Sequence, residues 1–257
     1  MPFDLARYHA LRHTRTVGTE VVHLEETGST MDDARAGAAA GRPVGTAYVA
    51  AAQTAGRGRQ GRSWVSEPGA GLWVTFHLQT PAAPGLVAAA AALAVADALE
   101  ATAGLTVDLK WPNDVLHGGR KICGILAESR PGAAGADVML GIGLNLRTPA
   151  GMPAEVLAIA TSIEQAGRPA PSREAMLAAL ATALERRLEA AEATPDALIE
   201  AWAARLVTLG RRVRVEAPGE TFEGMANAVD ASGALLVRLA DGSERACLAG
   251  DVHLADA

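Results

Sequence analysis

The sequence predicts an α+β protein in which a central mixed or antiparallel sheet, flanked by helices, is followed by a small C-terminal β-barrel. Helical and strand periodicities alternate up to about residue 210, whereas short strands separated by turn signals fill the rest of the chain. With 257 residues, of which 49% are hydrophobic, the chain can bury one substantial core and a small second one. We therefore expect two domains, residues 1–208 and residues 209–257.

The first part of the chain predicts the following elements in order. Ser29 or Thr30 caps a helix through Ala38, and strands follow over residues 48–52 and 72–78. Residues 86–96 predict a buried helix, because Pro84 lies near its first turn and Gly104 just past its end. Further strands are expected over residues 107–111, 121–128 and 138–146.

Two helices and a series of short strands complete the chain. Ser172 caps a long helix through Arg187, on which we expect Glu185, Arg186 and Arg187 to form a solvated face, and a second helix covers about residues 195–206. Strands over residues 212–216, 221–229, 234–239 and 244–248 are separated by the turn signals Pro218-Gly219, Ser232-Gly233 and Asp241-Gly242. This pattern is typical of a small barrel.

Composition excludes several functional classes. The apolar stretch at residues 86–96 is shorter than the roughly 18 residues that a membrane span requires. A net charge of -6 argues against generic nucleic-acid binding. Cys123 and Cys247 lie far apart and outside metal-ligand spacings, so we expect small buried residues of a reducing compartment. The N-terminus lacks the apolar run of a signal peptide, so we expect a cytoplasmic protein.

The loop over residues 56–64, GRGRQGRSW, is the most informative motif. Three permanently charged guanidinium groups within six residues repel one another unless an anion lies among them, and the glycines allow close backbone approach. Its glycines also fit the dinucleotide fingerprint, and Gly56-x4-Gly61-Arg62-Ser63 nearly fits a P-loop. Both of those motifs require a following helix, whereas residues 64–69 predict a turn. The loop therefore predicts anion binding through arginine side chains.

Four further motifs join this loop: residues 26–32, ETGSTMD; residues 110–115, KWPNDV; residues 121–126, KICGIL; and residues 141–145, GIGLN. In this order, and together with Gln53 and residues 250–252, they resemble the biotin protein ligase family over essentially the whole chain. The resemblance implies a biotin/lipoate ligase-like catalytic domain and an SH3-like C-terminal barrel. It implies ATP and biotin as substrates, Mg²⁺, and a lysine of a biotin carboxyl carrier domain as the acceptor.

The resemblance also implies roles for individual residues. Lys121, Arg57, Arg59 and Asp114 would be catalytic, with Asp114 also a candidate magnesium ligand. The biotin-binding set would be Ser29, Thr30, Gln53, Gly56, Arg57, Arg59, Lys121, Gly124, Gly141 and Gly143. The ATP-binding set would be Arg59, Arg62, Trp64, Asn113, Asp114, Lys121 and Asn145.

These residue types suit the chemistry that the resemblance implies. A carboxylic acid with a pKa of about 4.3 is already ionised at neutral pH, so biotin needs no general base to attack the α-phosphate. The step needs cations instead. An acceptor lysine with a pKa of about 10.4 must lose a proton before it attacks, and Asp114 is the candidate base. The reactive anhydride must then be shielded from water by a loop that closes over it.

Structural explanations and rival functions stay open for each motif. Ser29 and Thr30 can serve only as a helix cap, Lys110-Trp111 as an ordinary strand end, and Asp114 as a turn cap. The rival functions are lipoate ligation, a regulatory biotin or nucleotide module without catalysis, and nucleic-acid binding through the arginines.

Two departures from the family pattern bear on function. Met31 replaces the asparagine of many relatives. About two dozen residues precede Ser29, which is too few for a winged-helix DNA-binding domain, so we expect a dedicated ligase. A homodimer through an exposed sheet edge is a further expectation.

Overall fold

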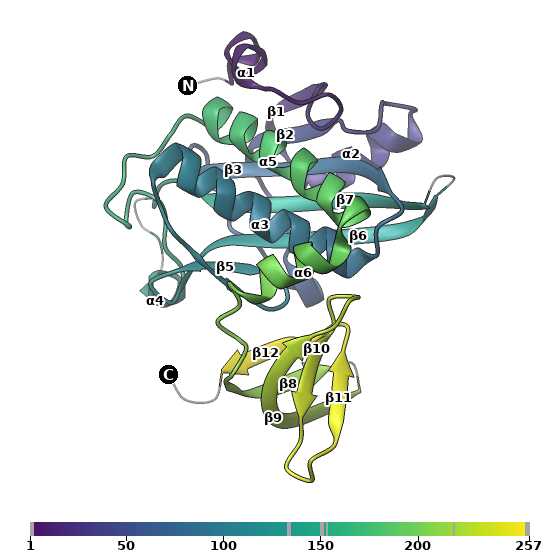
Figure 1. Ribbon diagram of the computed structural model, residues 1–257. Coiled ribbons are helices and arrows are strands. Elements are labelled where there is room, and N and C mark those ends of the chain that lie inside the picture. Colours follow the sequence, from purple (N-terminus) through teal and green to yellow (C-terminus); the bar gives the residue numbers. More distant parts are fainter. Residues whose placement is uncertain (1–2, 133–134, 150–151, 153, 218, 255–257) are drawn as a thin grey trace.

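The computed structural model describes residues 3–132, 135–149, 152, 154–217 and 219–254. It contains a large helix-covered body and a smaller C-terminal sheet below it (Figure 1). Both parts are built around the elements that the periodicities predict.

A seven-stranded mixed sheet forms the centre of the large body, with the strand order β1-β2-β3-β7-β6-β5-β4. β1 and β2 are parallel, and all the other neighbouring strands are antiparallel, which confirms the predicted mixed sheet. The strands are β1 (Val21–Thr27), β2 (Ala47–Gln53), β3 (Gly71–Thr80), β4 (Asp108–Lys110), β5 (Asp114–His117), β6 (Arg120–Gly132) and β7 (Gly135–Asn145).

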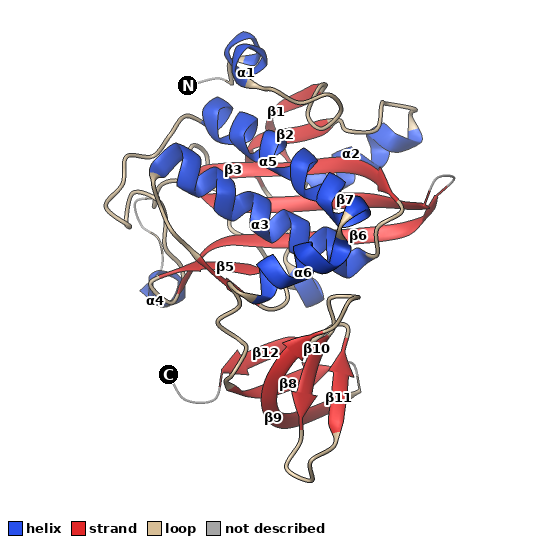
Figure 2. Cartoon of the chain, in the orientation of Figure 1, coloured by secondary structure: helices blue, strands red, loops and turns tan. Residues whose placement is uncertain are grey.

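Helices cover the two faces of this sheet. α3 (Pro84–Ala103), α5 (Arg173–Ala193) and α6 (Pro195–Ala203) lie on one face (Figure 2), and α2 (Thr30–Ala39) packs on the other. Alternate residues of β3 divide between these faces: Val74 and Phe76 enter the main core, whereas Trp73 and Thr75 line the cavity described below. The sheet therefore separates the main core on one face from the cavity on the other, which we call the working face.

α3 is the predicted buried helix. By length and composition it could cross a membrane, but most of it is buried against α5, α6 and the sheet. Pro84 begins the helix, and Gly104 ends it in a left-handed conformation, as the punctuation predicts. The helix thus forms the centre of the protein core.

The C-terminal part is a five-stranded antiparallel sheet with the order β11-β10-β9-β8-β12. No pairing between β11 and β12 is seen among the described residues, so the structure shows the strands of the predicted barrel without its closure. Pro218 of the predicted Pro218-Gly219 turn lies outside the described residues. The strands are β8 (Arg212–Ala217), β9 (Glu220–Val229), β10 (Leu235–Arg238), β11 (Glu244–Cys247) and β12 (Asp251–Leu254).

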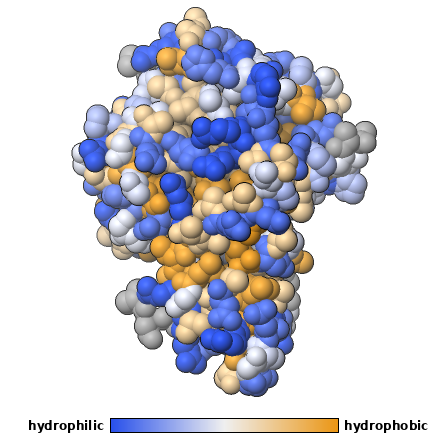
Figure 3. Space-filling view, in the orientation of Figure 1, coloured by the Kyte–Doolittle hydropathy of each residue, from blue (hydrophilic) through white to orange (hydrophobic). Residues whose placement is uncertain are grey.

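The two sheets meet at a tight junction. Trp111 is buried, and its Nε1 donates to the carbonyl oxygen of Gly233 at 3.0 Å. A Cβ built on Gly85 would lie 2.0 Å from the carbonyl oxygen of Ser232, so a glycine is required there. Apolar surface gathers at this waist in the space-filling view (Figure 3). Trp111 therefore joins the two sheets and is no ordinary exposed strand end.

Five helices and strands were not predicted: β1, β5, β12, α1 (Leu5–Leu11) and α4 (Ala154–Ile159). Each is short or half-exposed, so its apolar pattern is weak. Both predicted buried cysteines are confirmed as free and buried.

The solvated face predicted on α5 is confirmed for Arg186, which is exposed, but is wrong for Glu185 and Arg187, which are partly buried. The Glu185 carboxylate accepts hydrogen bonds from the backbone N–H groups of Arg15, Thr16 and Val17. Arg186 and Arg187 both pair with Asp97 of α3 at 2.9 Å. These side chains attach α5 to its neighbours, a long-range pairing that local sequence does not reveal.

Candidate active site

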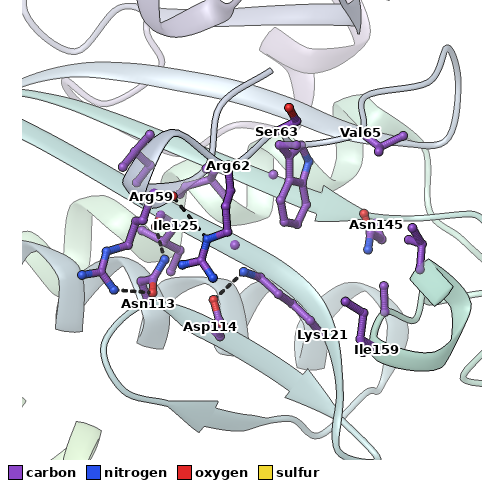
Figure 4. Close-up of a pocket in the computed structure, with 18 of the residues that line it drawn as sticks. Arg59, Arg62, Ser63, Val65, Asn113, Asp114, Lys121, Ile125, Asn145 and Ile159 are labelled. Carbon is purple, nitrogen blue, oxygen red and sulfur yellow. Dashed lines mark hydrogen bonds and ion pairs between the residues drawn. The ribbon is translucent and has the colours of Figure 1, made fainter. Parts of the chain in front are cut away.

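One cavity of about 830 Å³ opens on the working face of the seven-stranded sheet and reaches the C-terminal sheet. It brings together every sequence-predicted site residue except Gly56. Arg59, Arg62 and Lys121 direct their nitrogen atoms into the part of the cavity that Asn113 and Asp114 also line (Figure 4). Gly56 lies outside because its backbone packs against the loop itself, where a Cβ would be 2.5 Å from the carbonyl oxygen of Trp64.

The arginine loop folds back on itself between β2 and β3. Bridges join Gln53 to Ser66 and Arg57 to Ser63, and a single 3₁₀ turn (Arg59–Gly61) forms the tip. No helix follows the loop before β3, which agrees with the rejection of both helix-dependent phosphate motifs. Anion binding here must therefore rely on side chains.

Two of the loop's three arginines are paired with carboxylates. Arg57 Nη2 lies 2.7 Å from Asp32 Oδ1 on α2, and Arg62 Nη2 lies 2.8 Å from Asp251 Oδ1 on β12. These contacts hold the loop against two separate elements in the free protein.

Arg59 differs because its hydrogen-bond acceptors are uncharged. Its Nη1 donates to Asn113 Oδ1 and to the carbonyl oxygen of Gly250, both at 3.2 Å. Burial lowers the pKa of the Arg59 guanidinium, and an arginine pKa is high enough that the group stays charged at neutral pH. Arg59 therefore presents a partly buried positive charge, and no carboxylate of the described residues contacts it directly.

Lys121 and Asp114 form the central ion pair of the cavity. Lys121 Nζ lies 2.5 Å from Asp114 Oδ1 and 5.3 Å from the ring centroid of Trp64. The neighbouring thiol of Cys123 is completely buried, and this burial raises its pKa, so it is no thiolate nucleophile at neutral pH. The available chemistry is therefore that of charge stabilisation and proton transfer.

A second part of the cavity lining is a polar cluster of neutral groups. Gln53 Oε1 accepts from the backbone N–H of Thr30 at 2.9 Å and from its hydroxyl, while Gln53 Nε2 donates to Ser66. Thr30 also shares a 2.8 Å hydrogen bond with Thr75 of β3. Ser29 is the N-cap of α2, so it also has the structural role that its sequence position suggests.

Glycines on β6 and β7 form a floor beneath Trp64. A Cβ on Gly143 would lie 2.5 Å from Trp64 Nε1, and a Cβ on Gly124 would lie 2.8 Å from the Trp64 ring. Gly141 instead faces Met31, whose Sδ would be 2.9 Å from an added Cβ. Bare backbone is thus required at these positions for a flat ring to lie against the sheet.

The two predicted asparagines organise backbone around the site. Asn113 Nδ2 donates to the carbonyl oxygen of Ile125 at 2.7 Å, and Asn145 Nδ2 donates to that of Thr161 at 2.9 Å. The backbone N–H of Thr161 in turn donates to the carbonyl oxygen of Lys121. Asn113 thus connects the Arg59 side chain to β6, and Asn145 holds the segment that pairs with Lys121.

Residues that the sequence did not assign include Asp32 and Asp251, which pair with loop arginines, and Trp73 and Thr75, which line the cavity. The alternation along β3 could have placed Trp73 and Thr75 on one face. The pairing of Asp32 and Asp251 with loop arginines had no local signal, because these partners are far apart in sequence.

Comparison with known proteins finds two family models. The model described as "Biotin/lipoate A/B protein ligase family" matches residues 38–145, and "Biotin protein ligase C terminal domain" matches residues 208–254. A Mycobacterium tuberculosis "Biotin--[acetyl-CoA-carboxylase] ligase" is 39% identical over 241 residues, covering 90% of this chain and 88% of the relative. A Bacillus spizizenii "Bifunctional ligase/repressor BirA" is 33% identical over 244 residues, covering 90% and 73%.

Solved structures agree with these matches. A "Biotin protein ligase from Aquifex aeolicus in complex with biotin and ATP" is similar with a TM-score of 0.79 and 27% identity, covering 93% of this chain and 100% of that one. The Leishmania major biotin protein ligase in complex with biotinyl-5-AMP has a TM-score of 0.60 and 28% identity, covering 90% and 99%.

Proposed function

The chain belongs to the biotin/lipoate A/B protein ligase family and is an ATP-dependent biotin ligase, and we propose that it transfers biotin, through biotinyl-5'-adenylate, to a lysine of a biotin carboxyl carrier domain. The observation that carries the proposal is one cavity in which three loop arginines and Lys121 meet a glycine floor and a neutral polar pocket. This arrangement suits a ligand with a carboxylate at one end and an uncharged polar group at the other.

In the first step the biotin carboxylate attacks the α-phosphate of ATP, and pyrophosphate leaves. The carboxylate is already ionised, so the site supplies cations rather than a base. Arg57, Arg62 and Lys121 are each held by an acidic partner in the free protein, which keeps these side chains oriented before the anionic substrates arrive. Among the described residues Arg59 donates only to neutral acceptors, so it breaks no ion pair there when it binds a phosphate.

We assign the neutral polar cluster to the ureido group of biotin. Thr30 and Gln53 supply donors and acceptors there, and the glycine floor admits the ring system and chain against backbone. The proposed biotin-binding set is Ser29, Thr30, Gln53, Gly56, Arg57, Arg59, Lys121, Gly124, Gly141 and Gly143. Gly56 acts through the shape of the loop, because it does not line the cavity.

The nucleotide is assigned to the part of the cavity near the C-terminal sheet. The proposed set is Arg59, Arg62, Trp64, Asn113, Asp114, Lys121 and Asn145. Mg²⁺ is commonly held by one or two carboxylates together with substrate phosphates, and Asp114 offers such a carboxylate beside Lys121. When bound, the ion would neutralise phosphate charge.

In the second step the acceptor lysine must lose a proton, and we assign this proton to Asp114. Lys121 holds the Asp114 carboxylate in the free protein. Once Lys121 turns to the negative charges of the adenylate, the carboxylate is released beside the reacting carbonyl. Asp114 can then accept the proton as the lysine attacks and AMP leaves.

A direct assay tests the proposal. The full chain is incubated with ATP, Mg²⁺, a carrier domain and either biotin or lipoate, and the adenylate and the carrier mass are followed. We expect adenylate and a mass gain with biotin, and no gain with lipoate. Modification by lipoate alone would favour lipoate ligation, and adenylate without transfer would remove the carrier from the proposal. A salt-sensitive DNA shift would favour the nucleic-acid reading.

Three wider expectations belong to the same proposal. A cytoplasmic location fits two buried free cysteines. A homodimer can be tested at β1, which is an edge strand of the seven-stranded sheet, by measuring the mass in solution. We expect no nucleic-acid partner, since the net charge of -6 opposes binding to a polyanion.

A further inference from the structure

The last strand of the C-terminal sheet contributes to the cavity of the large body. Residues of β12 line it beside the arginine loop. The carbonyl oxygen of Gly250 accepts from Arg59 at 3.2 Å, and Asp251 Oδ1 accepts from Arg62 at 2.8 Å. Two of the three loop arginines therefore end on one short segment of the other sheet.

The Asp251 carboxylate depends on its arginine. Its side chain is only 13% exposed, whereas that of Arg62 is 60% exposed, so Arg62 covers a carboxylate that water hardly reaches. The residue opposite Asp251 on β8 is Glu216, and directly opposed residues of antiparallel strands share one face. Glu216 lies 3.3 Å from Arg214 and 3.8 Å from His253, whereas the cation in direct contact with Asp251 is Arg62. A mostly buried carboxylate is unfavourable without such a partner.

The loop in turn depends on an anchor. Its tip contains Gln60 with a φ of 54° and Gly61 with a φ of 73°, and its glycines give it many alternative conformations. The contact with Asp251 selects the conformation in which Arg59 also reaches Asn113, next to Asp114. A loop that is ordered before the substrate arrives loses less conformational entropy when it binds.

We propose that Asp251 is a positioning residue of the adenylation site: it docks the arginine loop on the C-terminal sheet through Arg62 and so makes that sheet one wall of the nucleotide subsite. Asp251 itself contacts no substrate. This inference rests on the proposed function for its kinetic consequence, but the docking of the loop can be tested in the free protein.

The test compares Asp251→Asn and Asp251→Glu with the parental chain. In the free protein we expect trypsin to cut after Arg57 and Arg59 about fivefold faster in Asp251→Asn, since an ion pair of this kind shifts a local equilibrium by up to about that factor. In adenylate formation we expect the KM for ATP to rise by a similar factor, with kcat and the KM for biotin within about twofold. Asp251→Glu should restore part of both effects, because it keeps the charge.

Glu223→Gln is the matched control, because Glu223 is an exposed carboxylate on β9 of the same sheet. If Asp251→Asn does not fold, Arg62→Gln removes the same contact, and its effect is measured by trypsin cleavage after Arg57 and Arg59. Parental cleavage rates would overturn the proposal, and so would a raised KM without faster cleavage, since Asp251 would then not act through the loop. If the parental chain makes no adenylate, the proposed function fails while the cleavage result still decides the docking.

Discussion

At the residue scale, most cationic side chains of the site form ion pairs in the free protein. Arg57, Arg62 and Lys121 each contact a carboxylate from another element. These ion pairs hold each cationic side chain in one orientation between turnovers. The acid and the base of each pair have different proposed roles. Substitution of one acid should therefore affect one particular step of the reaction.

Asp114 provides the clearest case. In Asp114→Asn we expect transfer from preformed adenylate to the carrier lysine to slow about 100-fold, which is typical for the loss of a general base. Adenylate formation needs no base, so any slowing of that step reports the proposed ATP and Mg²⁺ contacts of Asp114 instead. Single-turnover measurement of each step separates the two. Asp108→Asn, at the exposed start of the same hairpin, is the control. Transfer at the parental rate would show that Asp114 is not the base.

The glycine floor makes a steric prediction. Alanine at Gly143 would place its Cβ 2.5 Å from Trp64 Nε1, so the indole must leave its present position. We expect Gly143→Ala to raise the KM for biotin about tenfold, because the added methyl group would also occupy space proposed for biotin, and overpacking typically costs 1–3 kcal/mol. Gly28→Ala is the control, because a Cβ there meets nothing within 4 Å. An unchanged KM would mean that biotin does not lie on this floor.

At the scale of elements, sequence periodicity predicted the long helices and strands but missed several short ones. α3 and α5 have long apolar patterns and clear caps, and β3 alternates strongly, so each was predicted. β1 has no fully buried residue, and its pattern therefore carries little signal. The pairing of Glu185 with residues 15–17 joins positions about 170 apart, and no local pattern encodes such a contact.

Glu185 makes a prediction about pH. Burial by itself raises its pKa, but hydrogen bonds from the N–H groups of Arg15, Val17 and Thr16 outweigh this and hold the pKa at about 2, below the ordinary 4.5. Because the folded pKa is the lower one, the stabilisation is complete above pH 4.5 and is lost as the pH falls towards 2. We expect Glu185→Gln to lower the free energy of unfolding by about 1–2 kcal/mol at pH 7.

Denaturant titrations of parent and variant between pH 7 and pH 3 test this. The difference between them should narrow as the pH falls, because protonation removes the same charge from the parent. Glu189→Gln is the control on the same helix, since Glu189 pairs only with the exposed side chain of Arg15 among the contacts of the described residues. If the difference in the free energy of unfolding stays constant with pH, the loss of stability in Glu185→Gln does not come from the charge of Glu185.

At the scale of the whole molecule, the site lies between two sheets. The sequence predicted the bounds of the two domains but not their relative orientation. The motifs placed the arginine loop, Lys121 and the glycines on the large body, and the structure gathers nearly all of them in one cavity. The contribution of β12 could not be foreseen, because it follows from how the two sheets meet at Trp111 and Gly85. The angle between the sheets should therefore influence nucleotide binding.

Gly85→Ala tests whether the angle between the sheets influences nucleotide binding, because Gly85 lies at their junction and does not line the cavity. The added Cβ would lie 2.0 Å from the carbonyl oxygen of Ser232, so the 232–233 turn must move away from α3. We expect a loss of about 1–3 kcal/mol in stability from overpacking. We also expect a raised KM for ATP, because Gly250 and Asp251 move with their sheet, and an unchanged KM for biotin, whose proposed contacts lie on the large body. Ala101→Ser, on an exposed position of α3, is the control for helix composition. If both KM values stay parental while stability falls, the junction supports the fold without setting the nucleotide subsite.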